Sequence, residues 1–189
     1  MLLTLIELQR LKHLDRTGWT LRGLPTGTES VAAHSFGVCA TAMLLADEIK
    51  KRGLDVSMEL VLRMALIHDW AETRVGDMPK TATSYFGSEA RKHAEAKAFA
   101  DIVAPTGATQ YEDIFHDYEQ RRSIEARLVK AADVIDLLIQ ALALERTGAK
   151  GLDEFWDVAT EAGFQLPAEA DAVVKEVIDS ILRAREELR

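Results

Sequence analysis

The chain has 189 residues, which is long enough for one domain with a sizeable core and too short for two comfortable ones. Hydrophobic residues make up 48% and charged residues 29%, as in ordinary globular proteins, and the formal charge of −8 argues against binding to a nucleic acid polymer. The single cysteine excludes an internal disulfide and a thiolate zinc cluster, and without a long apolar run or a signal peptide we expect a cytoplasmic protein that does not bind membranes.

The first helix is expected over residues 2–13, where an amphipathic stripe of leucine and isoleucine begins. Residues 17–29 are rich in glycine and are not expected to hold a helix. Arg16 precedes this stretch, and Trp19 and Arg22 lie within it. Three large side chains thus fall on irregular backbone, where binding residues often occur. The alternative is a connector whose Trp19 fills the core.

Ser30 is a good N-cap for a second helix over residues 31–52, which Gly53 should end. His34 lies in the first turn of this helix, among small residues. A single histidine in such a place is more often a hydrogen-bonded core residue than a metal ligand. Its role therefore depends on which other side chains the fold brings to it.

A third helix is expected over residues 58–72, with Ser57 as its N-cap. It is apolar nearly all round, which predicts that it lies inside the protein. His68 and Asp69 nevertheless occupy its C-terminal end. A buried carboxylate needs a cation or a metal, because desolvating it alone is costly. Both side chains can reach one ion above the helix end, and Glu72 follows one turn later on the face of Asp69. The alternative is a polar helix end that frays into solvent.

Gly76 and Pro79 predict a turn after this helix that presents Asp77 and Lys80. Two more helices are expected over residues 88–103 and 110–121, and the second should be short, polar and aromatic. Their charged side chains and their histidines are expected to face solvent: Arg91, His93, Glu95, Lys97 and His116.

A long helix is expected over residues 124–146, with Ser123 as its N-cap. Its apolar residues recur with helical spacing and should face the core: Ile124, Leu128, Ala131, Ala132, Ile135, Ile139 and Leu142. The helix is therefore predicted to run through the middle of the protein.

Asp133 and Asp136 lie among these apolar residues, although aspartate is a poor helix former. Each could be an outward-facing carboxylate that aids solubility, and Lys130 could pair with Asp133. Helices over residues 152–162 and 168–188 complete a chain that we predict to be all-helical.

Three of the predicted helices each contribute candidate ligands, namely His34, the pair His68 and Asp69, and Asp133. Two imidazoles and two carboxylates form a nitrogen and oxygen ligand set that suits Mn²⁺, Co²⁺, Fe²⁺ or Zn²⁺ better than Ca²⁺. Four protein ligands on a six-coordinate ion leave two positions for water or substrate oxygens. That arrangement is typical of a catalytic metal rather than a structural one.

The pattern His34…His68-Asp69…Asp133 resembles the signature of HD-domain metal-dependent phosphohydrolases. Together with residues 16–19, 29–35, 68–72, 76–79 and 129–133, which occur in the family's order and at similar spacing, it resembles the branch containing 5′-deoxynucleotidases. These enzymes remove phosphate from deoxyribonucleoside 5′-monophosphates.

The resemblance extends over roughly residues 8–145. It implies an all-α HD-domain bundle of about seven to eight helices. The whole chain, residues 1–189, would form a single domain on which helices from residues 150–189 pack. It also implies a homodimer.

The resemblance further implies that the four candidate ligands hold one divalent ion, of Mn²⁺, Co²⁺, Fe²⁺, Zn²⁺ or Mg²⁺. Glu72 would orient or deprotonate the attacking water. Asp77 would be a second active-site carboxylate near the sugar and phosphate, able to give a proton to the leaving 5′-oxygen.

The resemblance assigns substrate-binding roles to the segment around Trp19. Arg16 would bind phosphate, with Arg22 as the rival, because two residues separate Arg16 from the tryptophan where some relatives have none. Trp19 would crowd a ribose 2′-hydroxyl and so favour deoxy substrates. Lys80 is expected to face the substrate as well.

Other HD proteins act on nucleoside triphosphates, cyclic dinucleotides or the alarmone guanosine tetraphosphate, and these substrates remain alternatives. Relatives with two or more metals carry extra histidines after the His-Asp pair. Here only His93 and His116 are available, which favours one metal. A second alternative is a non-catalytic regulator that binds metal or nucleotide, although such a protein would not need both Glu72 and Asp77.

Overall fold

The computed structural model of the chain describes residues 1–161 and 163–188, which form helices and loops. In these residues the only β-type pairing is an isolated antiparallel bridge between Asp15 and Ser30. The prediction of an all-helical protein is confirmed. None of the helices in the described ranges is both long enough and apolar enough to cross a membrane.

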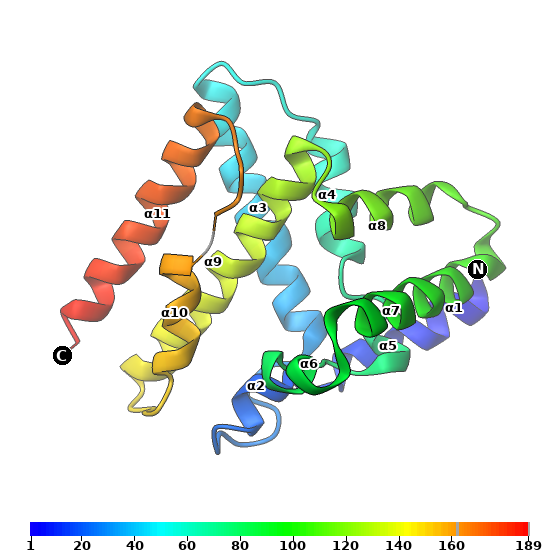
Figure 1. Cartoon of the computed structure of the whole chain (residues 1–189), viewed down its shortest axis with the longest axis horizontal. Helices are drawn as coiled ribbons and strands as arrows, with labels where there is room; N and C mark the ends of the chain where they lie inside the picture. Colours follow the sequence, from blue (N-terminus) through cyan, green and yellow to red (C-terminus); the bar gives the residue numbers. More distant parts are fainter. Residues whose placement is uncertain (162, 189) are drawn as a thin grey trace.

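Three helices pack against one another at the centre of the molecule (Figure 1): α3 (Val31–Lys51), α4 (Met58–Ile67) and α9 (Ile124–Arg146). Each begins at a predicted serine cap, whose hydroxyl accepts a hydrogen bond from a backbone amide of the first turn. Such a cap stabilises a helix by about 1 kcal/mol. Their facing sides are lined with buried apolar residues: Val38, Ala42, Leu45, Val61, Met64, Leu128, Ile135 and Leu138.

A second group of helices lies beside this centre: α1 (Leu2–Leu8), α5 (Glu72–Val75), α7 (Ser88–Val103) and α8 (Gln110–Gln120) (Figure 1). The rings of Phe99 and Phe115 stack at 4.2 Å and join α7 to α8 in a small apolar cluster. Thr4 of α1 donates a hydrogen bond of 2.9 Å to the carbonyl of Ile102. The N-terminal helix is thus attached to α7, and a 3₁₀ turn (Gln9–Lys12) leads away from it.

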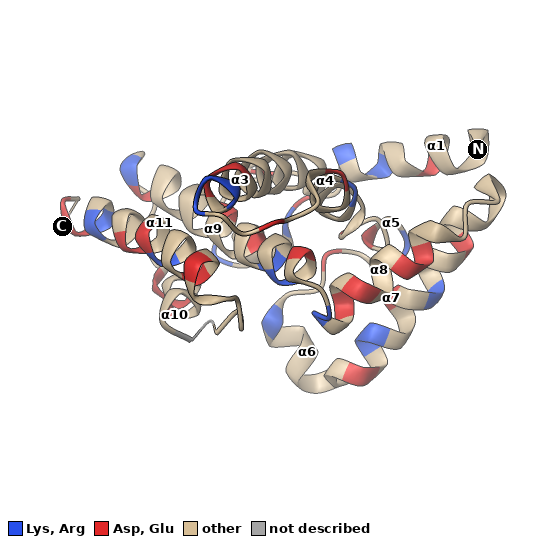
Figure 2. Ribbon diagram, turned by 90° about the horizontal axis from the view of Figure 1, so that it is seen from above, with Lys and Arg blue, Asp and Glu red and all other residues tan. Residues whose placement is uncertain are grey.

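Helices α10 (Asp153–Glu161) and α11 (Ala168–Glu186) pack on α9, and their apolar residues belong to the same core. Arg185 of α11 pairs with Glu145 of α9 at 2.9 Å. Residue 162, the predicted end of the first of these helices, lies outside the described residues. Acidic and basic segments are interspersed along α7 and α11 (Figure 2) rather than gathered into one basic stripe.

The structure corrects several predicted boundaries. The helix expected over residues 58–72 ends at Ile67, and a turn separates it from the short α5. The glycine-rich segment contains the four-residue helix α2 (Thr17–Thr20), and α6 (Lys80–Phe86) follows the predicted turn. The estimate of about seven to eight helices missed these short elements.

Two predictions of side-chain burial were also wrong. Ile139 was expected in the core but is 45% exposed, because it lies on the outer face of α9. Leu66 is 53% exposed, so α4 is not buried all round. The apolar run of α4 between residues 60 and 67 therefore includes a side chain that the core does not bury.

Candidate metal centre

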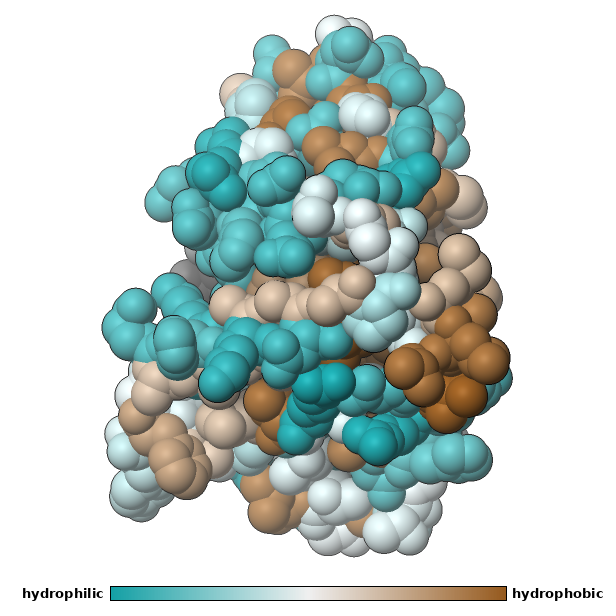
Figure 3. All heavy atoms as spheres, turned by 90° about the vertical axis from the view of Figure 1, so that its right-hand side faces the viewer, coloured by the Kyte–Doolittle hydropathy of each residue, from teal (hydrophilic) through white to brown (hydrophobic). Residues whose placement is uncertain are grey.

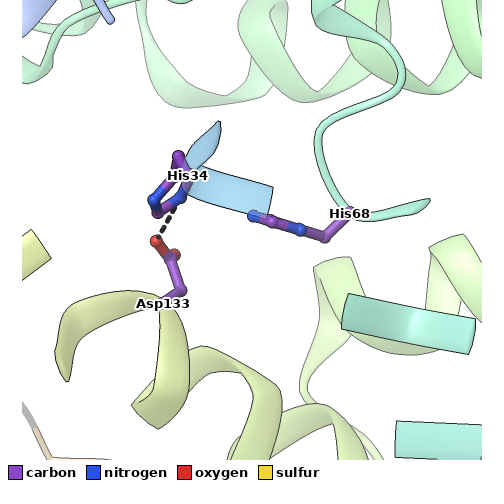
Figure 4. Close-up of side chains that lie close together, drawn as sticks. All are labelled: His34, His68 and Asp133. Carbon is purple, nitrogen blue, oxygen red and sulfur yellow. Dashed lines mark ion pairs between the residues drawn. The ribbon is translucent and has the colours of Figure 1, made fainter. Parts of the chain in front are cut away.

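Three of the four predicted ligands, His34, His68 and Asp133, lie close together where α3, the end of α4 and the middle of α9 converge (Figure 4). The fourth, Asp69, lies against both histidines. Nε2 of His34 lies 3.2 Å from Oδ1 of Asp133 and 3.7 Å from Oδ2 of Asp69. Nε2 of His68 lies 3.1 Å from the same oxygen of Asp69. The ligand atoms of His34, His68 and Asp133 all fall within 4.8 Å of one another. Residues separated by up to 99 positions in the sequence thus surround one point.

Four buried polar atoms in the described part of the chain lack a hydrogen-bond partner, and all four belong to this site. They are Nε2 of His34, Nε2 of His68, Oδ2 of Asp69 and Oε2 of Glu72. An unsatisfied buried polar atom costs about 1–3 kcal/mol, so proteins seldom retain a group of them without a ligand. Their convergence fits a divalent cation with an attached water.

The other ring nitrogens determine how the two histidines can act. Nδ1 of His68 lies 2.7 Å from the carbonyl oxygen of Ala65, and a carbonyl can only accept, so Nδ1 carries the proton. Nδ1 of His34 lies 2.8 Å from Oδ2 of Asp136, which assigns the proton in the same way for a neutral ring. Each histidine therefore offers the Nε2 lone pair that a metal requires.

The electrostatic environment of the site favours a cation. Burial alone would raise the pKa of Asp69, but His68, His34 and Arg16 outweigh it and hold that pKa below its ordinary range. Burial and Arg16 would lower the pKa of His34, but Asp136 at Nδ1 and Asp133, toward which a proton on Nε2 would point, raise it to about 9. In the absence of a metal, the surrounding carboxylates thus attract a proton to His34.

The pKa of Asp133 is also held well below its ordinary range. Burial opposes this shift, whereas the positive charge of Lys130 and the nearby ring of His34 cause it. Lys130 lies 2.8 Å from Oδ2 of Asp133, which confirms the predicted pair. The hydroxyl of Tyr118 donates to the same oxygen at 3.3 Å, so Oδ1 is the oxygen that faces the two histidines.

Glu72 begins α5 and is 7% exposed. Its pKa is raised well above the ordinary value by burial and by the nearby negative charges of Asp69 and Asp77. A carboxylate with a raised pKa is suited to proton transfer near neutral pH. The turn after His68 brings Glu72 to the rim of the ligand cluster.

Arg16 and Asp77 form the second part of the site. Nη1 of Arg16 lies 3.0 Å from Oδ1 of Asp77 and 3.6 Å from Oδ2 of Asp69. The other oxygen of Asp77 accepts a hydrogen bond of 2.5 Å from the backbone amide of Thr17. Gly76, with a φ of 79°, makes the turn that delivers Asp77 to this position.

The structure separates the two candidate arginines. Arg16 is placed beside the metal ligands because residues 14–16 pair with residues 29–31 just before α3. Arg22 is ion-paired with Glu154, and its guanidinium lies 5.8 Å from the centre of the Phe155 ring. Both line the same cavity, but of the two only Arg16 forms an ion pair with a candidate ligand.

A cavity of about 630 Å³ opens above the ligand cluster. Trp19 and Lys80 line it, as do Arg16, Asp69 and Glu72. Trp19 is also 1% exposed, donates a hydrogen bond of 2.6 Å to Glu29, and packs on Phe155 at 4.5 Å. The two interpretations of Trp19 are therefore compatible, since it fills the core and forms part of the cavity wall.

Several cavity residues were missed or misjudged from the sequence. Glu95 was expected in solvent but is 6% exposed, because α7 turns it toward the cavity and Arg91 pairs with it at 2.7 Å. Arg121 and Lys130 add two more cations to the walls. The four-residue spacing of Arg91 and Glu95 was the one available signal. His93 and His116 are exposed, as predicted.

Comparison with known proteins identifies a family that the chain matches. A profile described as an HD domain matches residues 8–163. The 5′-deoxynucleotidase HDDC2 of Danio rerio is 34% identical over 84% of this chain and 76% of its own length. The 5′-deoxynucleotidase hdd1 of Schizosaccharomyces pombe is 30% identical over 95% of this chain and 87% of its own length.

Solved structures resemble the fold over nearly the whole chain. The PH0347 protein of Pyrococcus horikoshii has a TM-score of 0.84 and 34% identity, covering 97% of this chain and 99% of that one. A predicted metal-dependent phosphohydrolase from Magnetospirillum magnetotacticum has a TM-score of 0.66 and 22% identity, covering 96% and 93%, which supports the fold alone.

Proposed function

The chain belongs to the HD domain family, and we propose that it is a metal-dependent phosphomonoesterase that hydrolyses deoxyribonucleoside 5′-monophosphates to deoxynucleoside and phosphate. The single observation that carries the proposal is the set of four unpartnered buried atoms beneath a cavity that also contains Arg16. The names of the curated relatives support the substrate class.

His34, His68, Asp69 and Asp133 would hold the ion. When bound, a divalent ion supplies positive charge that polarises a phosphoryl oxygen and makes a nearby water more acidic. Mn²⁺, Co²⁺, Fe²⁺, Zn²⁺ and Mg²⁺ are all compatible with two nitrogen and two oxygen donors, and the first four suit imidazole better.

Glu72 accepts the proton of the attacking water in this proposal. Its unpartnered oxygen and the nearby carboxylate of Asp69 support this role. A positioned general base typically contributes a factor of about 10²–10⁴ in rate. A bound cation would lower the pKa of Glu72 and so favour the ionised carboxylate that a general base requires.

Arg16 binds the phosphate through its guanidinium, whose donors form a fork that matches two phosphate oxygens. Asp77 accepts a hydrogen bond of 3.0 Å from that guanidinium and another from the backbone amide of Thr17. The main role of its carboxylate in this proposal is therefore to position Arg16. Proton donation to the leaving 5′-oxygen would require Asp77 to release one of these bonds.

The nucleoside would extend from the ion toward α10. The cavity lining includes the apolar residues Trp19, Leu137, Phe155 and Val158, of which the last two belong to α10. Trp19 is held on two sides, by a hydrogen bond to Glu29 and by packing on Phe155, and both contacts resist a shift of its ring away from a sugar placed against it. This rigidity supports its proposed role in excluding a ribose 2′-hydroxyl.

The test is phosphate release from five deoxyribonucleoside 5′-monophosphates and their ribose counterparts, with triphosphates and cyclic dinucleotides included. Metal-stripped protein would be restored with each ion in turn. Metal-dependent release from deoxy monophosphates, with ribose substrates slower, is the expected result. Release from triphosphates or cyclic dinucleotides alone would show that the substrate is not a nucleoside monophosphate. Nucleotide binding without turnover would favour a regulator.

A homodimer is part of the same proposal. On the face drawn in Figure 3, apolar side chains gather over α1, where Leu2, Leu3, Leu5 and Ile6 are all more than half exposed. An apolar patch of this kind is more often found where a second chain packs. Light scattering on the purified chain should give twice the monomer mass, and a monomer at micromolar concentration would contradict the proposal.

A further inference from the structure

Asp136 lies behind the candidate metal centre, on the side of His34 that faces away from the other ligands. Its Oδ2 is 2.8 Å from Nδ1 of His34, while Nε2 of the same ring faces Oδ1 of Asp133 at 3.2 Å. Asp133 and Asp136 are three residues apart on α9 and so lie on one helix face. A single helix face thus contacts both nitrogens of one imidazole.

We propose that Asp136 is a positioning residue that orients His34 for metal binding, and that Gly37 exists to let Asp136 reach it. The inference rests on the proposed metal centre but not on the identity of the nucleotide. Asp136 would not touch the ion or the substrate. It would act by accepting a hydrogen bond from Nδ1–H of His34, which keeps the proton on Nδ1 and leaves the Nε2 lone pair directed at the ion.

Gly37 supplies an independent observation. It lies one turn after His34 on α3, and a Cβ atom built there would fall 2.0 Å from Oδ1 and 2.7 Å from Cγ of Asp136. No side chain fits at position 37 unless Asp136 moves. Glycine weakens the interior of a helix, and no turn occurs here to require it. The close approach of α3 and α9 at this point explains why position 37 is a glycine.

Asp136 differs in this respect from an ordinary surface carboxylate. Its side chain is only 14% exposed, and its ring partner His34 is 1% exposed. Without an acceptor at Nδ1, a neutral His34 could carry its proton on Nε2 instead, and the ring could turn. Loss of an outer partner of this kind typically weakens metal binding by about 10–100-fold.

The test measures the Mn²⁺ dissociation constant of the full chain from the electron paramagnetic resonance signal of free Mn²⁺, without nucleotide. Asp136→Ala should weaken binding by about 10–100-fold. Asp136→Asn, whose amide oxygen can still accept from Nδ1, should recover part of that loss. Glu145→Gln is the matched control, since Glu145 is also a paired carboxylate on α9 but bonds Arg185 and Trp156. It should lower thermal stability and leave the dissociation constant unchanged.

Gly37→Ala adds a second variant that leaves every polar group in place. It should weaken Mn²⁺ binding to a similar extent as Asp136→Ala. The double variant should be no weaker than Asp136→Ala alone, because the clash at position 37 acts only through Asp136. If the fold-losses in Mn²⁺ affinity of the two single variants multiply in the double variant, the proposed link between Gly37 and Asp136 is wrong.

Three other results would overturn the inference. Wild-type affinity in Asp136→Ala would remove the positioning role, and equal losses in the Ala and Asn variants would leave only a packing role. Two Mn²⁺ ions per wild-type chain would make Asp136 a ligand, together with Glu29 and His34, which also lie within 4.8 Å of each other. Because no nucleotide is present, a chain that lacks phosphatase activity but shows the expected affinities would refute the proposed function alone.

Discussion

Removal of the metal should make the stability of this chain depend on pH in a window set by His34. The ring is buried and faces Asp133 and Asp136 on α9 and Asp69 after α4, while Arg16 opposes them. Its pKa in the folded, metal-free protein is about 9, against 6.5 ordinarily. A raised pKa means that the folded state holds a proton which the unfolded chain has released.

The sign and the size of the effect follow from this difference. The stabilisation from protonated His34 is fully present below pH 6.5 and is lost as the pH rises through about 9. The difference between these two pKa values corresponds to about 3 kcal/mol of unfolding free energy. With a divalent ion bound in place of the proton, this loss should disappear over the same window.

Urea unfolding of EDTA-treated protein at pH 6.5 and pH 9 provides the assay, with Mn²⁺-loaded protein measured in parallel. Glu72 also has a raised pKa and contributes a loss in the same direction, so His34→Gln is the necessary control. Between pH 6.5 and pH 9, the metal-free variant should lose about 3 kcal/mol less unfolding free energy than the metal-free wild type. An equal drop in wild type and variant would refute the assigned role of His34, and so would a drop that persists when Mn²⁺ is bound.

Three further substitutions and one matched control test the assigned roles. Asp69→Ala should abolish Mn²⁺ binding and phosphate release together, and activity in a variant that binds no metal would contradict the mechanism. Glu72→Gln should bind Mn²⁺ normally but lose about 10²–10⁴-fold in kcat, and full turnover would show that another group takes the proton. Arg16→Ala should lower kcat/KM by about 10–100-fold through the loss of charged hydrogen bonds to phosphate, and the matched Arg22→Ala should change it less than threefold. Equal losses in the two arginine variants would leave the phosphate ligand unassigned.

Much of the fold could be predicted because local signals and packing agree. Ser30, Ser57 and Ser123 each form the cap that their position predicted, since a serine side chain can satisfy an amide of the first turn wherever the helix lies. The short helices α2 and α6 were missed because they contain only one or two turns. Glycine or proline within or beside them is typical of loops and so predicts no helix.

The candidate ligands could be predicted because a histidine or an aspartate among apolar residues conflicts with its surroundings, and the family resemblance then linked them. Asp136 could not be distinguished from Asp133 in this way, since both interrupt the same apolar helix. Their roles differ only because α3 passes α9 with Gly37 at the crossing and with His34 between the two carboxylates. Glu95 was misjudged for a similar reason, as its burial depends on Arg91 and on where α7 lies relative to the cavity.

In the proposed mechanism, one divalent ion held by His34, His68, Asp69 and Asp133 makes this chain a deoxynucleotidase. The most direct test is to titrate Mn²⁺ into metal-stripped protein while phosphate release from dAMP is followed. Activity should rise from zero in proportion to Mn²⁺ and stop rising at one equivalent per chain. Full activity in excess EDTA, or a rise that continues to two equivalents, would contradict the account.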